Sequence, residues 1–212
     1  MTDDGVDKLV CVVRDAPPDL ELLRSLPARR LVVHRPHPDE PPEQPPDVHA
    51  VVLMWPHHDV TPSVDAETIA SWFPGARVDA YAVEEHVQIE PGLTPPPGSE
   101  PPGLCRLVFV RRAPSLTRDQ MAHHWTEQHT PIVRRHHPAF WGYVQNVVVA
   151  PVTPGAPEVD GVAEMRFRSA SDLRERFYDS DEGRRVVADD VARFLDRGAG
   201  WRILARDTWV LV

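Results

Sequence analysis

The side chains of this sequence that are best suited to proton transfer are histidines clustered in its second half. Five of the 11 histidines fall between positions 123 and 137. Neutral imidazole accepts and donates protons near pH 7. His129 stands apart because it falls at the predicted end of a helix, where a side chain can lean into a pocket. We therefore expect His129 to act as general base or acid; the alternative is a structural histidine bonded to a backbone carbonyl.

The remaining histidines carry weaker signals. His123 and Glu127 lie four residues apart on one predicted helix face, a spacing that can share a metal, but no HExxH motif is present. We therefore expect no metal site, and we interpret His136 and His137 as solvated. Three histidines of the first half could also reach a cavity, on position alone: His34, His58 and His86.

A helix between positions 117 and 131 must position His129. Thr117 and Gln120 have the spacing of a capping box, in which each side chain accepts a hydrogen bond from the backbone N–H of the other residue. Trp125 and the methionine four residues before it share a face that can pack on a sheet. Pro131 disfavours helical geometry at the preceding residue, so we expect the helix to end near His129.

A strand predicted over 159–168 could supply a partner for His129. Its apolar residues alternate with charged ones, so Glu164 and Arg166 should face away from the helices. That face is either solvated or covered by a second sheet, and in the second case both charges point into an interior. There Glu164 would orient His129 or share proton transfer, and Arg166 would hold a developing enolate, a role that favours a fixed cation in a water-poor cavity.

Aromatic and amide side chains on the neighbouring predicted strand, 140–149, could complete a substrate pocket. Alternate residues of this strand lie on opposite faces, and the sequence leaves open which set faces inward. The residues that we expect to bind substrate, together with Arg166, are Trp125, Trp141, Tyr143 and Asn146.

The composition excludes several classes of function. Net charge is −9 without a block of like charges, which argues against a nucleic-acid or anionic-membrane partner. No apolar run approaches the ~20 residues of a transmembrane helix, and the acidic N-terminus is unlike a secretory signal. Cys11 and Cys105 fall at strand-like positions and predict reduced, buried residues of a cytoplasmic protein. No phosphate-binding loop or nucleophile elbow occurs, so we expect no cofactor.

The sequence contains an internal repeat of about 98 residues. A strand-like segment that starts at Lys8 precedes Ala16-Pro17, and a similar segment that starts at Arg106 precedes Ala113-Pro114. Both halves predict the order β-α-β-β-α-β. We therefore expect a degenerate unit over 1–90, a proline-rich linker over 91–103 and a second unit over 104–212.

The end of the second half has a less regular pattern. Ser169 and Asp172 form a predicted capping box that opens a helix, which should be interrupted near Gly183 and then resume. Gly198 and the glycine two residues later should end it, and the last strand should span 201–212. Each unit would form a sheet with helices on one face, and the open faces would cover each other. The predicted fold class is α+β: two ferredoxin-like βαββαβ units that form one pseudo-dimeric α/β barrel.

Several short motifs of the second half also occur together in a known protein family. They are Trp125-(three residues)-His129-Thr-Pro131, Tyr143-Val-Gln-Asn146, Gly161-Val-Ala-Glu164 with Phe167, Ser180-Asp-Glu-Gly183, Asp189-Asp190 and Phe194. On these motifs, residues 104–212 resemble an EthD domain of the dimeric α/β barrel superfamily. Residues 8–90 look like a degenerate second copy of the same unit.

The resemblance implies a ferredoxin-like fold and a barrel with a central cavity. Relatives include aromatic polyketide cyclases and a lactone isomerase, and related barrels include cofactor-free monooxygenases and haem proteins. Relatives use a histidine at the position of His129, and many carry another where this sequence has Val147. They usually dimerise to close the barrel. A tandem copy would close it within one chain, and whether a homodimer also forms stays open.

The resemblance and the residue pattern together predict a cofactor-independent enzyme of secondary metabolism. We expect a lyase or isomerase, of cyclase, dehydratase or isomerase type, that acts by proton transfer on a hydrophobic, oxygenated substrate such as a polyketide or lactone. One alternative is a cofactor-free or haem-dependent monooxygenase on the same barrel. Another is a non-catalytic accessory protein that binds a small molecule.

Overall fold

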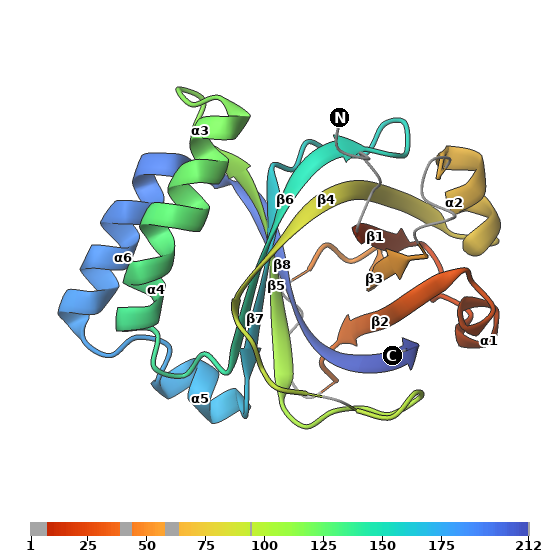
Figure 1. Cartoon of the computed structure of the whole chain (residues 1–212), viewed down its shortest axis with the longest axis horizontal. Helices are drawn as coiled ribbons and strands as arrows, with labels where there is room; N and C mark the ends of the chain where they lie inside the picture. The colour runs from red at the N-terminus through yellow and green to blue at the C-terminus, as the bar shows by residue number, and fades with distance from the viewer. Residues whose placement is uncertain (1–7, 39–43, 58–63, 94, 212) are drawn as a thin grey trace.

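Eight strands close into a single barrel in the computed structural model, which describes residues 8–38, 44–57, 64–93 and 95–211 (Figure 1). Their order around the barrel is β1-β3-β2-β8-β5-β7-β6-β4, and every neighbouring pair is antiparallel. The predicted α+β barrel is therefore confirmed. The strands are β1 Lys8–Arg14, β2 Ala28–Pro36, β3 Val48–Pro56, β4 Arg77–Ile89, β5 Leu104–Arg112, β6 Gly142–Pro151, β7 Gly161–Phe167 and β8 Leu195–Leu211.

Helices cover the outside of the barrel on two opposite flanks. Figure 1 shows α1 and α2 on the flank of the first four strands, and α3, α4 and α6 together on the other flank. Among the described residues, no helix has the length and apolar character needed to span a bilayer. The helices are α1 Leu20–Arg24, α2 Ala66–Trp72, α3 Arg118–His123, α4 Thr130–His136, α5 Ala170–Glu175 and α6 Asp181–Phe194, with a π-helical segment, His124–His129, between α3 and α4.

The strands of each half of the chain are neighbours in the barrel. The first half runs β4-β1-β3-β2 and the second half runs β6-β7-β5-β8. The halves join at two seams, where β2 pairs with β8 and β4 pairs with β6. The first and last strands of the chain therefore belong to one continuous sheet.

Alternation along the strands produces three buried apolar clusters. Successive side chains of a strand point to opposite faces, so β1 sends Val10 and Val12 into the barrel and Leu9 and Cys11 toward the helices. The barrel cluster also contains Leu107 and many β-branched residues. The other two clusters lie between the sheet and the helices of each flank.

The similar sequence segments in β1 and β5 differ in the direction of their side chains. Lys8 lies on the barrel face with Val10, whereas Arg106 lies on the helix face, between the inward-facing Cys105 and Leu107. The alignment of Lys8 with Arg106 read in the sequence therefore does not hold for the faces of the sheet. A shift of one residue moves every side chain to the other face of a sheet, so similarity of residue type alone could not set the register.

The helix that carries His129 continues beyond that residue, so the predicted end near His129 is wrong. Thr117 is the N-cap, and the predicted capping box with Gln120 is present. The π-helical segment then leads directly into α4, where Pro131 occupies the first turn. A proline has no backbone N–H to donate at this point, and the carbonyl of Trp125 in the preceding turn accepts a hydrogen bond from Gln145 Nε2 at 2.9 Å.

The end of the chain also differs from the sequence prediction. The helical break lies between α5 and α6, at residues 176–180, while Gly183 lies inside the first turn of α6. Ser180 caps α6 by accepting a hydrogen bond from the Gly183 N–H at 2.9 Å. A side chain at Gly183 would collide with Asp179 and His136, so glycine permits this close approach. The last strand begins at Leu195, because the chain turns from helix to strand directly after Phe194.

Substitution of Gly161 by alanine should destabilise the second half of the barrel. A Cβ at Gly161 would overlap the Trp125 indole ring, which is wedged between β7 and the helices. Overpacking of this kind costs about 1–3 kcal/mol. Urea unfolding should show the loss for Gly161→Ala and almost none for Gly198→Ala, where the nearest atom is the mobile carboxylate oxygen of Asp196 at 3.4 Å. Equal stability of the two variants would contradict the packing described here.

Candidate functional site

The barrel interior contains a buried ion-pair network centred on Lys8. The Lys8 ammonium, which is fully buried, lies 2.5 Å from Glu164 Oε1 and 2.7 Å from Glu85 Oε1. Asn146 Nδ2 donates to the same Glu164 oxygen at 2.9 Å. Burial alone would raise the pKa of Glu164, but the positive charge of Lys8, helped by His34, lowers it to about 2. Glu164 is therefore a carboxylate at neutral pH and is unsuited to act as a general acid.

A second group of interior charges is built around Asp207 on β8. Arg166 donates to Asp207 Oδ2, and His34 Nδ1 lies 3.1 Å from Asp207 Oδ1. Burial would raise the pKa of Asp207, but His34 and Arg166 hold it below its usual range. The Arg30 guanidinium lies between two indole rings, 4.2 Å from that of Trp55 and 4.5 Å from that of Trp209. These contacts fix the interior side chains in place.

His129 lies outside the barrel, in the layer between β7 and α6. Its Nδ1 lies 2.8 Å from Asp190 Oδ2, and His124 Nε2 lies 3.0 Å from the other oxygen of the same carboxylate. The carboxylate can only accept, so both imidazoles donate to it. Both rings also pack on Phe194. Burial lowers the pKa of His129 despite the bond to Asp190, so its imidazole is neutral at pH 7.

Beside His129, a buried hydrogen-bond network joins the helix to β6. Trp125 Nε1 donates to the Tyr143 hydroxyl at 3.0 Å. Gln145 Nε2 contacts the Tyr143 hydroxyl at 3.1 Å and the backbone carbonyl of Trp125 at 2.9 Å. Burial raises the pKa of Tyr143 to about 12, so it remains a neutral phenol. These contacts hold the π-helical segment against the sheet.

The structure separates the predicted catalytic pair. His129 faces the helices and Glu164 faces the barrel interior, on opposite sides of β7. The prediction that Glu164 orients His129 is therefore wrong, because Asp190 takes that place and Glu164 is bonded to Lys8. Strand alternation causes the separation, since Ala163 and Met165 rather than Glu164 share the helix face.

The predicted substrate-binding residues are likewise divided between two faces. Asn146 and Arg166 lie in the barrel interior, and Trp125 and Tyr143 lie in the helix layer. Trp141 is half-buried near one end of β6, with its ring 4.6 Å from the Arg168 guanidinium. The structure therefore does not gather the predicted set around one pocket.

Two further histidine predictions need correction. His136 and His137 were expected to be solvated, but both are buried. His137 Nδ1 donates to the Phe177 carbonyl at 2.6 Å, and its ring stacks on Phe140. Among the first-half histidines, His34 reaches the barrel interior, His86 lies 3.2 Å from Glu84 on β4, and His58 falls outside the described residues.

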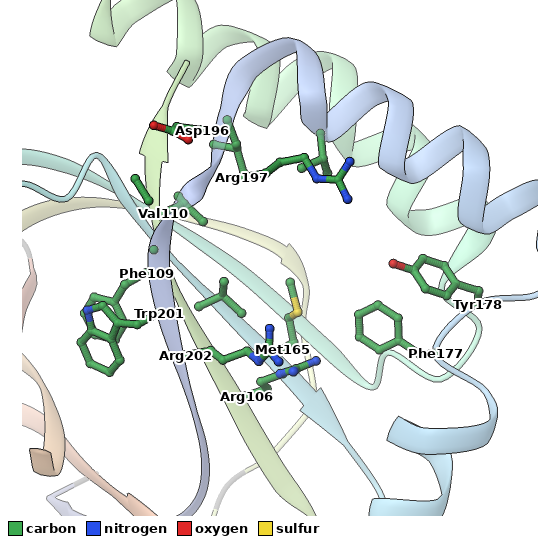
Figure 2. Close-up of a pocket in the computed structure, with 15 residues that line it drawn as sticks. Arg106, Phe109, Val110, Met165, Phe177, Tyr178, Asp196, Arg197, Trp201 and Arg202 are labelled. Atoms are coloured by element: carbon green, nitrogen blue, oxygen red, sulfur yellow. The ribbon is translucent and has the colours of Figure 1, made fainter. Parts of the chain in front are cut away.

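A cleft between α6 and the helix face of β5, β7 and β8 is the strongest candidate for a binding site (Figure 2). Its volume is about 440 Å³, within the range of small-molecule sites. We call it the α6 pocket. Arg106 and Arg202 lie together on its sheet wall beside Met165, and Phe177 and Tyr178 face them across the cavity. The rest of its lining is Val108, Phe109, Val110, Val191, Leu195, Asp196, Arg197, Ala199, Gly200 and Trp201.

The sequence analysis missed the main residues of both the pocket and the interior network. Arg106 and Arg202 were not singled out, although they alternate with apolar residues on strands whose other face is buried. Lys8 was used only to align the repeat. A lysine that shares the face of Val10 and Val12 is a signal for a buried cation, and alternation alone could have found it. Asp207 had no comparable local signal.

Comparison with known proteins supports the family resemblance and the fold. Residues 113–198 match the family model of the EthD domain. The solved structure of an anthrone oxidase-like protein is 10% identical with a TM-score of 0.57, over 99% of this chain and 96% of that one. A candidate monooxygenase from Lactobacillus acidophilus NCFM is 8% identical with a TM-score of 0.49, over 97% of each chain. No curated protein matches the sequence.

These comparisons overturn the predicted enzyme class. The structure that shares the fold with a TM-score of 0.57 carries the name of an anthrone oxidase-like protein, not of a lyase or isomerase. The expectation of a lyase or isomerase is therefore contradicted. At this level of identity the likeness itself shows a shared fold, the closed barrel with helices outside.

The buried histidines should make the protein lose stability between about pH 6.5 and pH 4. Burial lowers the pKa of His137 to about 4, so in this window the unfolded chain binds a proton that the folded protein does not. The free energy of unfolding should fall by about 3 kcal/mol from this residue. His137→Asn keeps an N–H donor for Phe177 and should flatten the slope in urea titrations at several pH values.

A matched control is Phe177→Leu, which disturbs the same aromatic cluster but removes no titrating group. It should lower stability at every pH and keep the slope. Protonation of Glu164 reduces the free energy of unfolding in a different pH range. Because its pKa is lowered in the folded protein, this loss of stability begins only below about pH 4.5. An unchanged slope in His137→Asn above pH 4.5 would show that His137 is not the group responsible.

Proposed function

We propose that the protein, whose residues 113–198 match the family model of the EthD domain, is an oxidoreductase of monooxygenase type that oxidises an acidic aromatic small molecule in the α6 pocket. The observation that carries this proposal is the pairing of two arginines with an aromatic wall inside one cavity. The same fold in a protein named anthrone oxidase-like supports the oxidative class.

The sheet wall of the pocket suits an anion. Arg106 and Arg202 lie on adjacent strands, and each is two positions from the residue opposite the other in the β5–β8 ladder, which places both on the same face of the sheet. Their guanidinium groups approach the same space (Figure 2). Arginine binds oxyanions through several N–H donors in a fixed plane. A phenolate or enolate oxygen placed between them would be stabilised by both charges.

The opposite wall suits a flat aromatic body. The Phe177 and Tyr178 rings contact each other edge to face, 4.8 Å between centroids, and His137 packs against both. Met165 and Val108 add apolar surface on the sheet wall, across the cavity from these rings. A fused aromatic ring system can therefore pack on apolar side chains while its oxygen reaches the arginines.

This arrangement favours direct reaction of a substrate anion with dioxygen. For an anthrone-like substrate, a ring CH₂ beside a carbonyl loses a proton, and the resulting electron-rich anion is oxidised by O₂. The CH₂ carbon gains one oxygen and loses two hydrogens, and the second oxygen leaves as water. Substrate is oxidised and dioxygen is reduced, so the balance needs no further reductant.

Within this proposal the pocket residues have distinct roles. Arg106 and Arg202 stabilise the anion and so lower the barrier to its formation, as donors aimed at developing charge do. Asp196, the carboxylate of the described lining, lies at the other end of the cavity from the two arginines (Figure 2), so the proton passes to water, which can enter the open pocket. His129 and Asp190 position α6, which carries Val191 and leads into Leu195 of the pocket.

We also propose that the barrel consists of two tandem ferredoxin-like units. Numbered within each half, the strand order is 4-1-3-2 in both, and the two seams join the second strand of one half to the fourth of the other. This order supports the domain division at 1–90, 91–103 and 104–212. The α6 pocket lies wholly within residues 104–212, but the EthD match over 113–198 includes neither Arg106 nor Arg202.

Removal of either pocket arginine should reduce oxidation sharply. With a hydroxylated anthrone as substrate, Arg106→Gln and Arg202→Gln should each lower kcat/KM by about 10- to 100-fold, because each deletes a charge that stabilises the anion. Oxygen consumption and mass spectrometry of the quinone product would measure the loss. Arg193→Gln on α6 is the matched control, because this exposed arginine does not line the pocket.

Three results would contradict the proposal. Both arginine variants could keep wild-type turnover, the wild type could bind the anthrone without consuming oxygen, or purified protein could show a haem absorption band that is required for turnover. The second result would point to a non-catalytic binding protein, and the third to a haem-dependent oxygenase.

A further inference from the structure

We propose that His34, Cys105 and Asp207 form a binding site for a thiophilic divalent metal ion, of which Zn²⁺ is the best match, inside the barrel. One imidazole nitrogen, the thiol sulfur and a carboxylate oxygen of these residues all lie within 4.8 Å of one another. All three residues are buried, and His34 and Cys105 are completely so. The site is separate from the α6 pocket, because Cys105 and Arg106 are consecutive on β5 and face opposite sides of the sheet.

Unsatisfied polar atoms converge on this site. His34 Nδ1 lies 3.1 Å from Asp207 Oδ1, but the geometry makes no hydrogen bond, and neither atom has another partner. The other ring nitrogen of His34 also has none. Buried polar atoms without partners cost free energy and are rare in folded proteins. An ion bound to one imidazole nitrogen and to Asp207 Oδ1 would satisfy two of these atoms at once.

The separations fit a tetrahedral ion. Zinc binds imidazole nitrogen at about 2.0–2.1 Å, carboxylate oxygen at about 2.0–2.2 Å and thiolate sulfur at about 2.3 Å. Two such ligands at a tetrahedral angle are a little over 3 Å apart, close to the observed separation of the His34 nitrogen and the Asp207 oxygen. Cys105 needs only a small movement to complete three ligands.

The two carboxylate oxygens of Asp207 have the different surroundings expected of a metal-bound carboxylate. Its Oδ2 accepts a hydrogen bond from Arg166, which leaves Oδ1 directed at His34. Ligating carboxylates in proteins are commonly held by such an outer hydrogen bond, which fixes their orientation. Arg166 is therefore a positioning residue of the site and not a ligand.

The ligand set selects the class of metal. Sulfur and imidazole ligands suit Zn²⁺ and similar transition ions, whereas Mg²⁺ and Ca²⁺ prefer oxygen alone. A thiolate and a carboxylate carry two negative charges, and the Asp207 carboxylate is shared with the Arg166 guanidinium. The nearby Lys8 is already paired with Glu85 and Glu164, so the surrounding network adds no uncompensated cation from that side.

The site joins the two halves of the chain. His34 lies on β2 and is opposite Asp207 where β2 pairs with β8. Cys105 lies on β5 and is opposite Ala205 of β8, which is two residues from Asp207 and on the same face of that strand. Ligands from both halves come together only when the barrel closes. The free energy of metal binding at such a site adds to the free energy of folding. The ion would therefore stabilise the pairing of β2 with β8.

The test measures metal content and the electronic spectrum of tag-free, full-length protein. Wild type should take up one equivalent of Zn²⁺ after dialysis, and Co²⁺ in its place should give a thiolate-to-cobalt charge-transfer absorption. Cys11→Ser is the matched control, since Cys11 is an equally buried strand cysteine on the helix face of β1. It should bind like wild type, whereas Cys105→Ser and Asp207→Asn should bind about 100-fold more weakly or worse, because loss of even an outer partner costs 10- to 100-fold.

Thermal unfolding supplies a second readout that does not require the variants to fold equally well. Zn²⁺ should raise the Tm of wild type and of Cys11→Ser, and a chelator should reverse the rise. The proposal is overturned if Co²⁺ gives no thiolate band with wild type, or if Zn²⁺ leaves its Tm unchanged. It is also overturned if Cys105→Ser binds as tightly as Cys11→Ser. None of these results depends on turnover in the α6 pocket, so the proposed function stands or falls separately.

Discussion

The structure depends on the requirement that charges enclosed by barrel closure must be paired. Each half of the chain supplies a sheet with helices on one face, and the other faces meet as the barrel interior. Lys8 of the first half and Glu164 of the second lie 2.5 Å apart within it. Removal of one partner of such a buried pair typically costs about 3–5 kcal/mol, because the other charge stays buried and unpaired. The pair therefore fixes the position of β1 relative to β7 across the barrel interior.

This constraint explains why the interior is a poor place for proton-transfer chemistry. Glu164 and Asp207 are held as carboxylates by adjacent cations, and Arg30 is fixed between two indole rings. Groups locked in this way can hold an ion but cannot readily exchange protons with a substrate. The α6 pocket has the opposite character, with arginines and aromatic rings around a cavity that is open to solvent. In the proposed function, the chemistry therefore takes place on the helix side of the sheet, and the interior charges hold the barrel together.

The sequence predicted the elements of the fold well where local signals decide them. The first strand follows from its apolar run and the capping box at Thr117 from spacing, while the barrel was inferred from the order of elements in the two halves. Prediction from the sequence failed where contacts between distant residues determine the structure. The π-helical segment after His123 is stabilised by Gln145 from β6, and the partner of Glu164 is a lysine 156 positions away in the chain.

The candidate site was harder to predict than the fold for the same reason. His129 and Glu164 look like a pair in the sequence, but strand alternation places them on opposite faces of β7, and Asp190 on α6 is the partner of His129. The α6 pocket combines Arg106, Phe177 and Arg202 from three distant segments. Each residue type is ordinary on a surface, and only the closed sheet with α6 above it brings the three together.

The most direct test of the account is a crystal structure of the protein with a hydroxyanthraquinone, a product-like anionic aromatic ligand. We expect the ring system to pack on Phe177 and Tyr178 and an ionised oxygen to contact Arg106 and Arg202. A ligand bound inside the barrel against Glu164 and Arg166, or one seated against His129, would contradict the assignment of the α6 pocket as the site of chemistry.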